Sequence, residues 1–371
     1  MTTMLPVLLR DYANFGISDA GWILIILHLT QATAGLSSGI FIKKAGSRIA
    51  YTIGASGKAF YIVILAISAS PIPLFILAPI AGLSRSLFWS GAFSYVMQNT
   101  NSKTKGAGSG LLSMATVLGP ALIAPPLALI VNSFGLDTFL GGCITLLLVS
   151  VGITYGLVQD APKVKNATEI NSGHRHLAQM RTVLLDVGVR NSILTRMSTA
   201  FVFGVFILLS ALKITDLTGS IVLVGPLITA GAIGGGIAQI IIGIVSDRIG
   251  RKSLLVVAVL LCSISSAIFG ATNSIILLLI CSSVQMLSQQ ACQTLVVASC
   301  GDHSTSDQMG NVMAILTSGF SISFVAGVTA ASSGLIFSNA TPYYVASVVC
   351  LSGIFAASRI PRHNHSCVIK G

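Results

Sequence analysis

Long apolar runs separated by short polar turns dominate this sequence. An α-helix needs about 20 residues to cross a hydrocarbon core of about 30 Å, and about eleven runs approach or exceed that length. Only 8% of the residues are charged, against about 25% in soluble domains, so the chain cannot cover a water-facing surface. We therefore predict an all-α polytopic membrane protein with spans at 20–42, 49–69, 73–98, 107–131, 138–158, 191–213, 219–246, 253–272, 274–299, 312–337 and 342–358.

The most distinctive turn joins two of these runs and reads Gly-Ile-Val-Ser-Asp-Arg-Ile-Gly-Arg-Lys over residues 243–252. Gly243 would let two helices approach closely, and Gly250 supplies the backbone freedom that a tight turn needs. Asp247 is free to pair with the bases or to sit at a neighbouring helix N-terminus. Three basic side chains would hold the turn on the cytoplasmic side: Arg248, Arg251 and Lys252. The alternative is a solvated basic loop that only sets topology.

This G-x-x-x-D-R-x-G-R-K pattern between membrane-length runs resembles the loop signature of the major facilitator superfamily (MFS) of secondary transporters. The resemblance implies two pseudo-symmetric six-helix bundles that rock around a midplane site, giving alternating access. It implies a cavity lined by the first and fourth helix of each bundle, and a carrier rather than an enzyme. It also implies a gating role for the turn, with Gly243 and Gly250 permitting close packing beside Asp247, Arg248, Arg251 and Lys252.

A weaker copy of the turn stands 204 residues earlier, at 39–48. One shift aligns three pairs of glycines: Gly39 with Gly243, Gly46 with Gly250, and Gly106 with Gly310. The first copy has Lys43 where the second has Asp247. We interpret this register as an internal repeat of two homologous halves.

The repeat and a hydrophilic central stretch predict the organisation of the chain. We expect an N-terminal transmembrane bundle at 1–158 (helices 1–6), a cytoplasmic linker at 159–190, a C-terminal bundle at 191–358 (helices 7–12) and a cytoplasmic tail at 359–371. About 14 residues of helix 1 have no counterpart, so we expect a truncated helix 1 or a start assigned too late. Basic turns fall on one side when spans alternate, which places both termini in the cytoplasm and the chain in the cell membrane.

Two runs carry polar residues at matching depth. Arg85 lies near the middle of helix 4, where an arginine costs several kcal/mol unless it faces water, a partner or a ligand. Its repeat partner belongs to a stripe at i, i+4, i+8 spacing in helix 10, made of Gln285, Gln289 and Gln293. Because the resemblance places both helices at the cavity, we predict that these residues bind substrate. A packing charge and interhelical hydrogen bonding are the alternatives.

Three further polar residues lie in apolar runs. Lys58 is deep in helix 3, and we include it among the substrate-binding residues, although its ammonium could instead snorkel toward a neighbour. His28 in helix 2 could titrate near neutral pH, but we expect a hydrogen-bonded packing residue. Arg196, near the start of helix 7, is either at the cavity mouth or an interfacial anchor.

The predicted spans contain no Asp or Glu, so they offer no carboxylate that could relay protons. Deep basic groups without an acid favour a small organic or inorganic anion as substrate. Export of lipophilic or cationic compounds is the alternative within transport, and a transporter-like sensor is the alternative outside it. The net charge of +11 comes from bases in short loops, which indicates topology and no nucleic acid. No P-loop, metal constellation or nucleophile is visible, so we expect a monomer that needs no cofactor or metal and binds the bilayer, a small-molecule substrate and a coupling ion.

Overall fold

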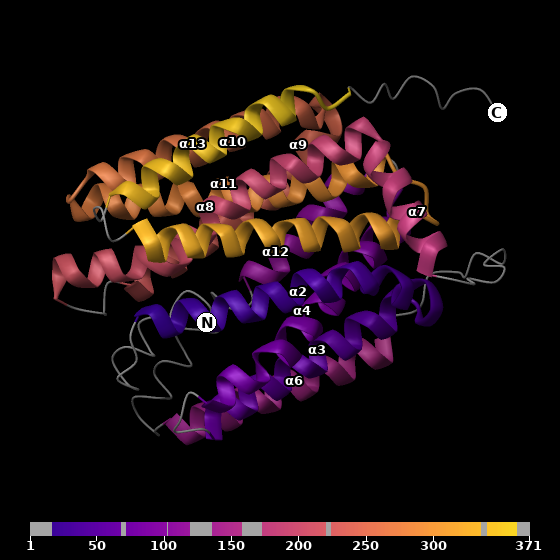
Figure 1. Ribbon diagram of the computed structural model, residues 1–371, viewed down its shortest axis with the longest axis horizontal. Coiled ribbons are helices and arrows are strands. Elements are labelled where there is room, and N and C mark those ends of the chain that lie inside the picture. The colour runs from indigo at the N-terminus through magenta and orange to yellow at the C-terminus, as the bar shows by residue number, and fades with distance from the viewer. Residues whose placement is uncertain are drawn as a thin grey trace.

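The computed structural model describes residues 17–67, 72–101, 103–118, 136–157, 173–219, 224–334 and 340–361. Within these ranges all regular structure is helical (Figure 1). The helices are α2 (Ile17–Ala45), α3 (Ser47–Ile67), α4 (Ile72–Asn99), α6 (Leu136–Leu157), α7 (Gly173–Leu185), α8 (Val187–Thr218), α9 (Val224–Ile249), α10 (Arg251–Ala271), α11 (Ile275–Asp302), α12 (Met309–Gly334) and α13 (Thr341–Ser358). Residues 105–118 form a further helical segment before α6.

The predicted spans coincide with these helices, with differences at their ends. α8 begins at Val187, inside the predicted linker, because the Asp186 side chain caps it by accepting a hydrogen bond from the Val189 amide at 2.8 Å. The linker also contains α7. The expectation of a truncated helix 1 falls on residues 1–16, and the later part of the predicted span 107–131 falls after residue 118, so both lie outside the described residues.

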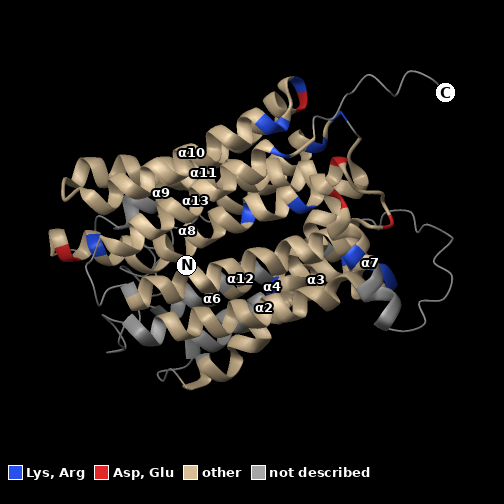
Figure 2. Cartoon of the chain, turned by 45° about the horizontal axis from the view of Figure 1, so that its top comes forward, with Lys and Arg blue, Asp and Glu red and all other residues tan. Residues whose placement is uncertain are grey.

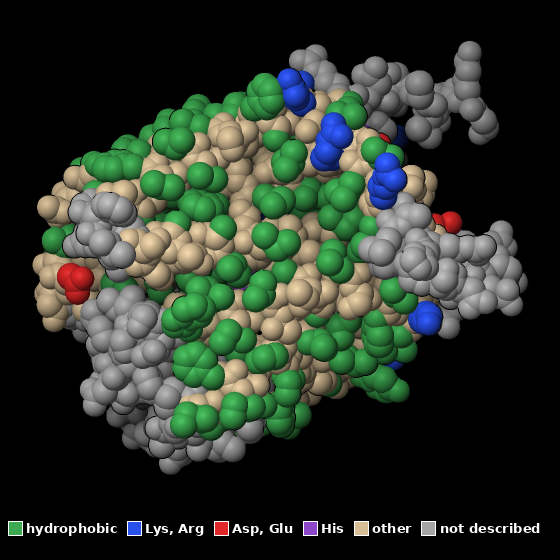
Figure 3. Space-filling view, viewed as in Figure 1, with side chains coloured by type: hydrophobic (Ala, Val, Ile, Leu, Met, Phe, Trp, Pro, Cys, Tyr) green, Lys and Arg blue, Asp and Glu red, His purple; other side chains and the backbone are tan. Residues whose placement is uncertain are grey.

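Seven of the described helices are long and apolar enough to cross a membrane. Apolar side chains spread over the flank of the bundle (Figure 3), and many large ones, including Ile76, Leu148 and Val348, are more than 60% exposed. A lipid-facing surface is the environment in which such exposure is favourable. The protein is therefore a multi-pass membrane protein.

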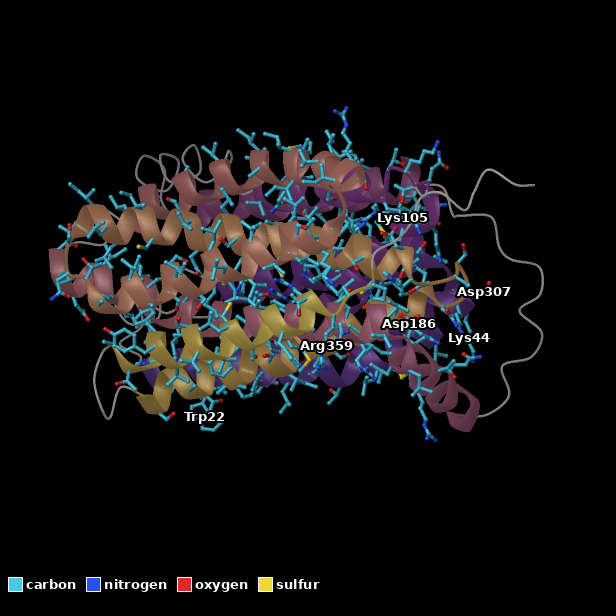
Figure 4. The ribbon with its side chains drawn as sticks, turned by 90° about the horizontal axis from the view of Figure 1, so that it is seen from above. Trp22, Lys44, Lys105, Asp186, Asp307 and Arg359 are labelled. Atoms are coloured by element: carbon cyan, nitrogen blue, oxygen red, sulfur yellow. The ribbon has the colours of Figure 1, made fainter. Side chains whose placement is uncertain are left out.

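Charged side chains gather at one end of the bundle (Figure 2). Lys44, Lys105, Asp186 and Asp307 lie at this end, and Trp22 lies away from it (Figure 4). We call it the basic end, since it also carries the turn 243–252 and the Lys43 that ends α2.

Helices from the two sequence halves meet along two seams. In one, α2 packs against α12; in the other, α9 packs against the segment 105–118. Each seam contains a close glycine contact. A Cβ on Gly243 would lie 2.3 Å from the Gly106 carbonyl oxygen, and a Cβ on Gly39 would lie 2.6 Å from Asn311 Oδ1 and 3.2 Å from its Cα.

These contacts follow the repeat register. Gly39 and Gly243 occupy equivalent places in their seams, 204 residues apart. The turns that follow them are equivalent as well, because Gly46 has φ 97° and Gly250 has φ 90°. That left-handed backbone favours glycine. Two pseudo-symmetric halves therefore meet face to face, as the repeat predicted.

Candidate functional site

A cavity of about 170 Å³ lies where the two halves face each other. Six helical elements line it: α2, α4, the segment 105–118, α8, α11 and α12. Its polar lining consists of Gln31, Arg85, Thr116, Arg196, Gln289, Gln290, Gln293 and Thr317. Its apolar lining consists of Trp89, Phe93, Val117, Phe203, Val297, Leu316 and Phe320. The described lining contains two arginines and no carboxylate, so the cavity is electropositive.

Arg196 is the better anchored of the two arginines. Its Nη1 donates to Gln289 Oε1 and its Nη2 to Gln293 Oε1, both at 2.9 Å. The guanidinium also lies over the ring of Phe320, with Cζ 4.5 Å from the ring centroid. Gln289 is held in turn, because its amide nitrogen donates to the Thr199 carbonyl oxygen. Bonded and stacked in this way, Arg196 is part of the cavity wall rather than an anchor at the membrane interface.

Arg85 is held much less tightly. Its buried Nε has no hydrogen-bond partner among the described residues, and neither has the buried Oε1 of Gln31 on the neighbouring helix α2. Buried polar atoms in native proteins are nearly always paired, so exceptions need a reason. Both groups line the cavity, where a bound solute would be in reach.

The α4 and α11 surfaces of the cavity mirror each other. The repeat shift of 204 residues aligns Arg85, Trp89 and Phe93 of α4 with Gln289, Gln293 and Val297 of α11. All six residues line the cavity. Each stripe follows i, i+4, i+8 spacing, so it occupies one helix face. The repeat therefore presents a charged and aromatic strip from one half to an amide strip from the other.

Aromatic rings form the apolar part of the wall. Trp89 stacks on Phe93 with ring centroids 5.3 Å apart. On the opposite half, Phe203 lies 6.4 Å from Phe320. Such rings offer a flat, apolar contact surface beside the two guanidinium groups. The described cavity wall thus combines positive charge with aromatic surface.

The predicted substrate-binding residues divide into three groups. Arg85, Gln289 and Gln293 line the cavity. Gln285 does not: it accepts from Ser265 Oγ at 2.7 Å and donates to Cys262 Sγ at 3.2 Å, which fastens α11 to α10. The position of the Lys58 side chain lies outside what the structure describes.

The sequence missed the aromatic lining residues and Gln31. A Trp or Phe in an apolar helix carries no compositional signal. The stripe spacing would have pointed to Trp89 and Phe93, which continue the face of Arg85.

At the basic end, Asp247 joins the two halves. Its Oδ1 accepts from the Gly106 amide at 2.9 Å and its Oδ2 from the Ala107 amide at 3.0 Å. These amides begin the segment 105–118, so the carboxylate caps a helix N-terminus and complements its positive dipole end. The close approach of Gly243 to Gly106 makes this contact possible.

Arg251 extends the contact to a third helix. It pairs with Asp247 at 3.2 Å and with Asp302 at the end of α11 at 2.5 Å. All three side chains are less than 10% exposed, so this is a buried network rather than a surface pair. Gly250 supplies the turn, whereas Arg248 is exposed and Lys252 is half-buried at the rim.

The seam between α2 and α12 is joined by different contacts at the equivalent position. Lys43 stands where the repeat has Asp247, and its Nζ donates to Gln179 Oε1 at 2.8 Å. Asn311 Nδ2 reaches the same oxygen at 3.4 Å. Gln179 belongs to α7, so at this seam the linker helix bridges α2 and α12.

Membrane-length helices in two related halves, a polar cavity between them and a charged network that joins the halves at one end define a solute carrier. A family comparison gives the same class: the model of the Major Facilitator Superfamily matches residues 1–213 and 192–368. The chain belongs to this family, and its architecture is the MFS fold that the turn motif predicted. It is a membrane transporter.

A solved structure gives a detailed match in architecture. The crystal structure of the human organic anion transporter MFSD10 (TETRAN) superposes with a TM-score of 0.80 and 17% sequence identity, covering 96% of this chain and 95% of that one. At this identity the likeness shows the fold alone. No match was found among curated proteins. Among the described residues, no group of three or more His, Cys, Asp or Glu side chains could hold a metal ion.

Proposed function

We propose that this protein is a secondary transporter of the cell membrane that moves a small organic anion by alternating access. The observation that carries the proposal is Arg85, a guanidinium on the cavity wall whose buried Nε has no partner among the described residues. A cation at bilayer depth is stabilised by facing water, a partner or a ligand. A carboxylate or sulfonate would complete its hydrogen bonding and neutralise its charge.

The lining argues for an organic anion over an inorganic one. Aromatic side chains make up much of the apolar wall, including Trp89 and Phe320, and an apolar or aromatic body would bury against them. The described lining has no carboxylate to attract a cation. The structural neighbour described as an organic anion transporter shares the fold, which supports the same class.

The network around Asp247 gives the proposed gate. We place the basic end in the cytoplasm because short cytoplasmic loops collect Lys and Arg. With Asp247 capping the segment 105–118, the two halves are joined on that side. Opening the cavity to the cytoplasm requires this cap and the Arg251 pairs to separate while the halves rock apart. At the other seam, Gln179 must release either Lys43 of α2 or Asn311 of α12.

Counterflow in liposomes tests the proposal. Purified protein is reconstituted with unlabelled benzenesulfonate inside, and uptake of labelled benzenesulfonate is measured. We expect uptake by the wild type and a fall to background for Arg85→Gln, since the neutral amide cannot pair with the anion. The matched control is Arg190→Gln, an exposed arginine in α8 away from the cavity, which should keep wild-type uptake.

Three outcomes would contradict the proposal. Uptake of a quaternary ammonium probe in place of the sulfonate would indicate a carrier of cations. Retained benzenesulfonate uptake by Arg85→Gln would make Arg85 a packing charge. Binding of the sulfonate without any counterflow would favour a sensor.

A further inference from the structure

His28 is a buried titratable group that the proposed transport cycle does not yet use. Its side chain is 0% exposed, and neither ring nitrogen has a hydrogen-bond partner among the described residues. The hydrogen-bonded packing role expected from the sequence is therefore not what its contacts show. A buried imidazole without partners carries a desolvation cost, and imidazole is the side chain that gains or loses charge between about pH 5 and 8.

The ring lies directly behind the cavity wall, at the seam between the two halves. It stacks on Phe324 of α12 with centroids 3.9 Å apart and lies 6.1 Å from Phe320, a cavity-lining residue. Gln31, one turn further along α2, lines the cavity and has a buried Oε1 without a partner among the described residues. A proton entering the cavity would therefore find an unpaired acceptor at Gln31 and then His28.

Arg85 is the charge that faces His28. It belongs to α4, which packs against α2, and it lines the same cavity as Phe320, whose ring lies 6.1 Å from His28. α12 holds no titratable residue, and among the residues that the structure describes, the other cation near this wall is Arg196 of α8, beside Phe320. Neither α4 nor residues 21–42 of α2 contain Asp or Glu. Of the titratable groups further off, Tyr51 of α3, Tyr95 of α4 and Lys43 and Lys44 of α2 lie toward the basic end, and the Lys58 side chain is outside the description.

This arrangement couples the charge of His28 to the occupancy of the cavity. In the empty protein, the uncompensated charge of Arg85 opposes a second positive charge on His28. An anion bound at Arg85 cancels that repulsion, so the imidazole can accept a proton. By thermodynamic linkage the effect is reciprocal. If a bound anion raises the proton affinity of His28 by some factor, protonation of His28 raises the affinity for the anion by the same factor.

We propose that His28 is a proton carrier, and that the protein moves one proton together with each monovalent anion. The proton comes from water on the side where the anion binds and adds to a free imidazole nitrogen. It leaves to water on the other side after the anion has dissociated, which restores the neutral ring. A proton and a monoanion together carry no net charge, so transport is electroneutral. This inference rests on the proposed anion transport.

Proton movement by the wild type is the first test. Benzenesulfonate stays ionised across the pH range used, so any proton that moves with it belongs to the protein. We expect inward benzenesulfonate flux to acidify a pyranine-loaded lumen, and valinomycin with potassium to leave the flux unchanged. Sulfonate flux without acidification, or flux that depends on the membrane potential, would overturn the inference.

Variants identify the carrier. We expect wild-type protein to bind benzenesulfonate roughly tenfold more tightly near pH 5.5 than near pH 8. His28→Gln, which cannot take up a proton, should bind equally at both values, and any net inward sulfonate flux through it should not acidify the lumen. The matched control is His303→Gln at the basic end, whose Nδ1 lies 2.9 Å from the Ser299 carbonyl oxygen, and it should keep the wild-type dependence.

The outcomes separate the two proposals. Failure of wild-type counterflow removes the transport function on which this inference rests. Net uptake of benzenesulfonate without proton movement removes only the inference. Wild-type pH dependence retained by His28→Gln would also remove it, and if that variant does not fold, the lumen measurement on wild-type protein still decides.

Discussion

At the residue scale, the cavity shows which kinds of side chain a sequence can reveal. Arg85 and the glutamine stripe were predictable because polar groups at bilayer depth are costly and therefore conspicuous. The aromatic residues beside them were not, since Trp89 and Phe320 look the same as lipid-facing or core residues in composition. Arg196 was ambiguous, because only the fold shows that Gln289 and Gln293 from another helix meet its guanidinium.

The aromatic wall can be tested at Phe320. Phe320→Leu keeps an apolar side chain but removes the ring that lies beneath Arg196 on the cavity wall. We expect benzenesulfonate affinity to fall by about 1 kcal/mol, roughly fivefold, and methanesulfonate affinity to stay unchanged because that anion has no ring. Equilibrium binding in detergent measures both. Phe201→Leu is the control, since Phe201 is half-buried in α8 and does not line the cavity; equal losses for both anions would count against an aromatic contact.

At the element scale, the seam between α9 and the segment 105–118 depends on backbone proximity. The motif predicted a glycine for close packing but could not show its partner, because Gly106 is 137 residues away in the sequence. Two backbones in contact leave no space for a side chain, so helix register along this seam is fixed at one point. Asp247 reaches the Gly106 amide only when that register is kept.

Gly243→Ala tests this seam. The added Cβ would lie 2.3 Å from the Gly106 carbonyl oxygen and 2.9 Å from its carbon, so the helices must separate, at an expected cost on the order of 1–3 kcal/mol. We expect a lower thermal unfolding temperature in detergent and slower counterflow. Gly234→Ala in the same helix meets nothing within 4 Å and should match the wild type. Identical behaviour of the two variants would show that the contact does not limit stability.

At the scale of the whole molecule, the repeat made the architecture of two related halves predictable, although it did not show which residues meet across the seams. Helix ends were less predictable, because local capping decides them: Asp186 starts α8 inside the predicted linker. The role of α7 could not be seen either, since it depends on where a polar helix docks. Nothing in its sequence signals that Gln179 accepts from Lys43 and Asn311.

The asymmetry between the seams predicts opposite effects for two substitutions. Lys43→Asp would place a carboxylate opposite the N-terminus of α12, as Asp247 is placed opposite Gly106, and should favour closure of the basic end. Asp247→Asn should favour opening, since the amide is a weaker cap. To measure both effects, a cysteine is introduced at Thr317 in the cavity. Its rate of reaction with a hydrophilic thiol reagent added from the basic side reports how open that end is.

Lys44→Asp provides the control for this comparison. It makes the same change of charge one residue along, on an exposed side chain. Accessibility that changes equally in Lys43→Asp and Lys44→Asp would indicate a general charge effect instead of a local cap.

The contacts of Gln179 also bear on whether the two halves must be joined in one polypeptide. Because one amide oxygen of α7 contacts both α2 and α12, α7 is fastened to the body of the protein by its own side chains and not only by the peptide chain that leads to it. A nick placed between residues 157 and 173 would leave these contacts untouched. The two halves produced as separate polypeptides, with α7 on the second, should therefore still find each other in the membrane.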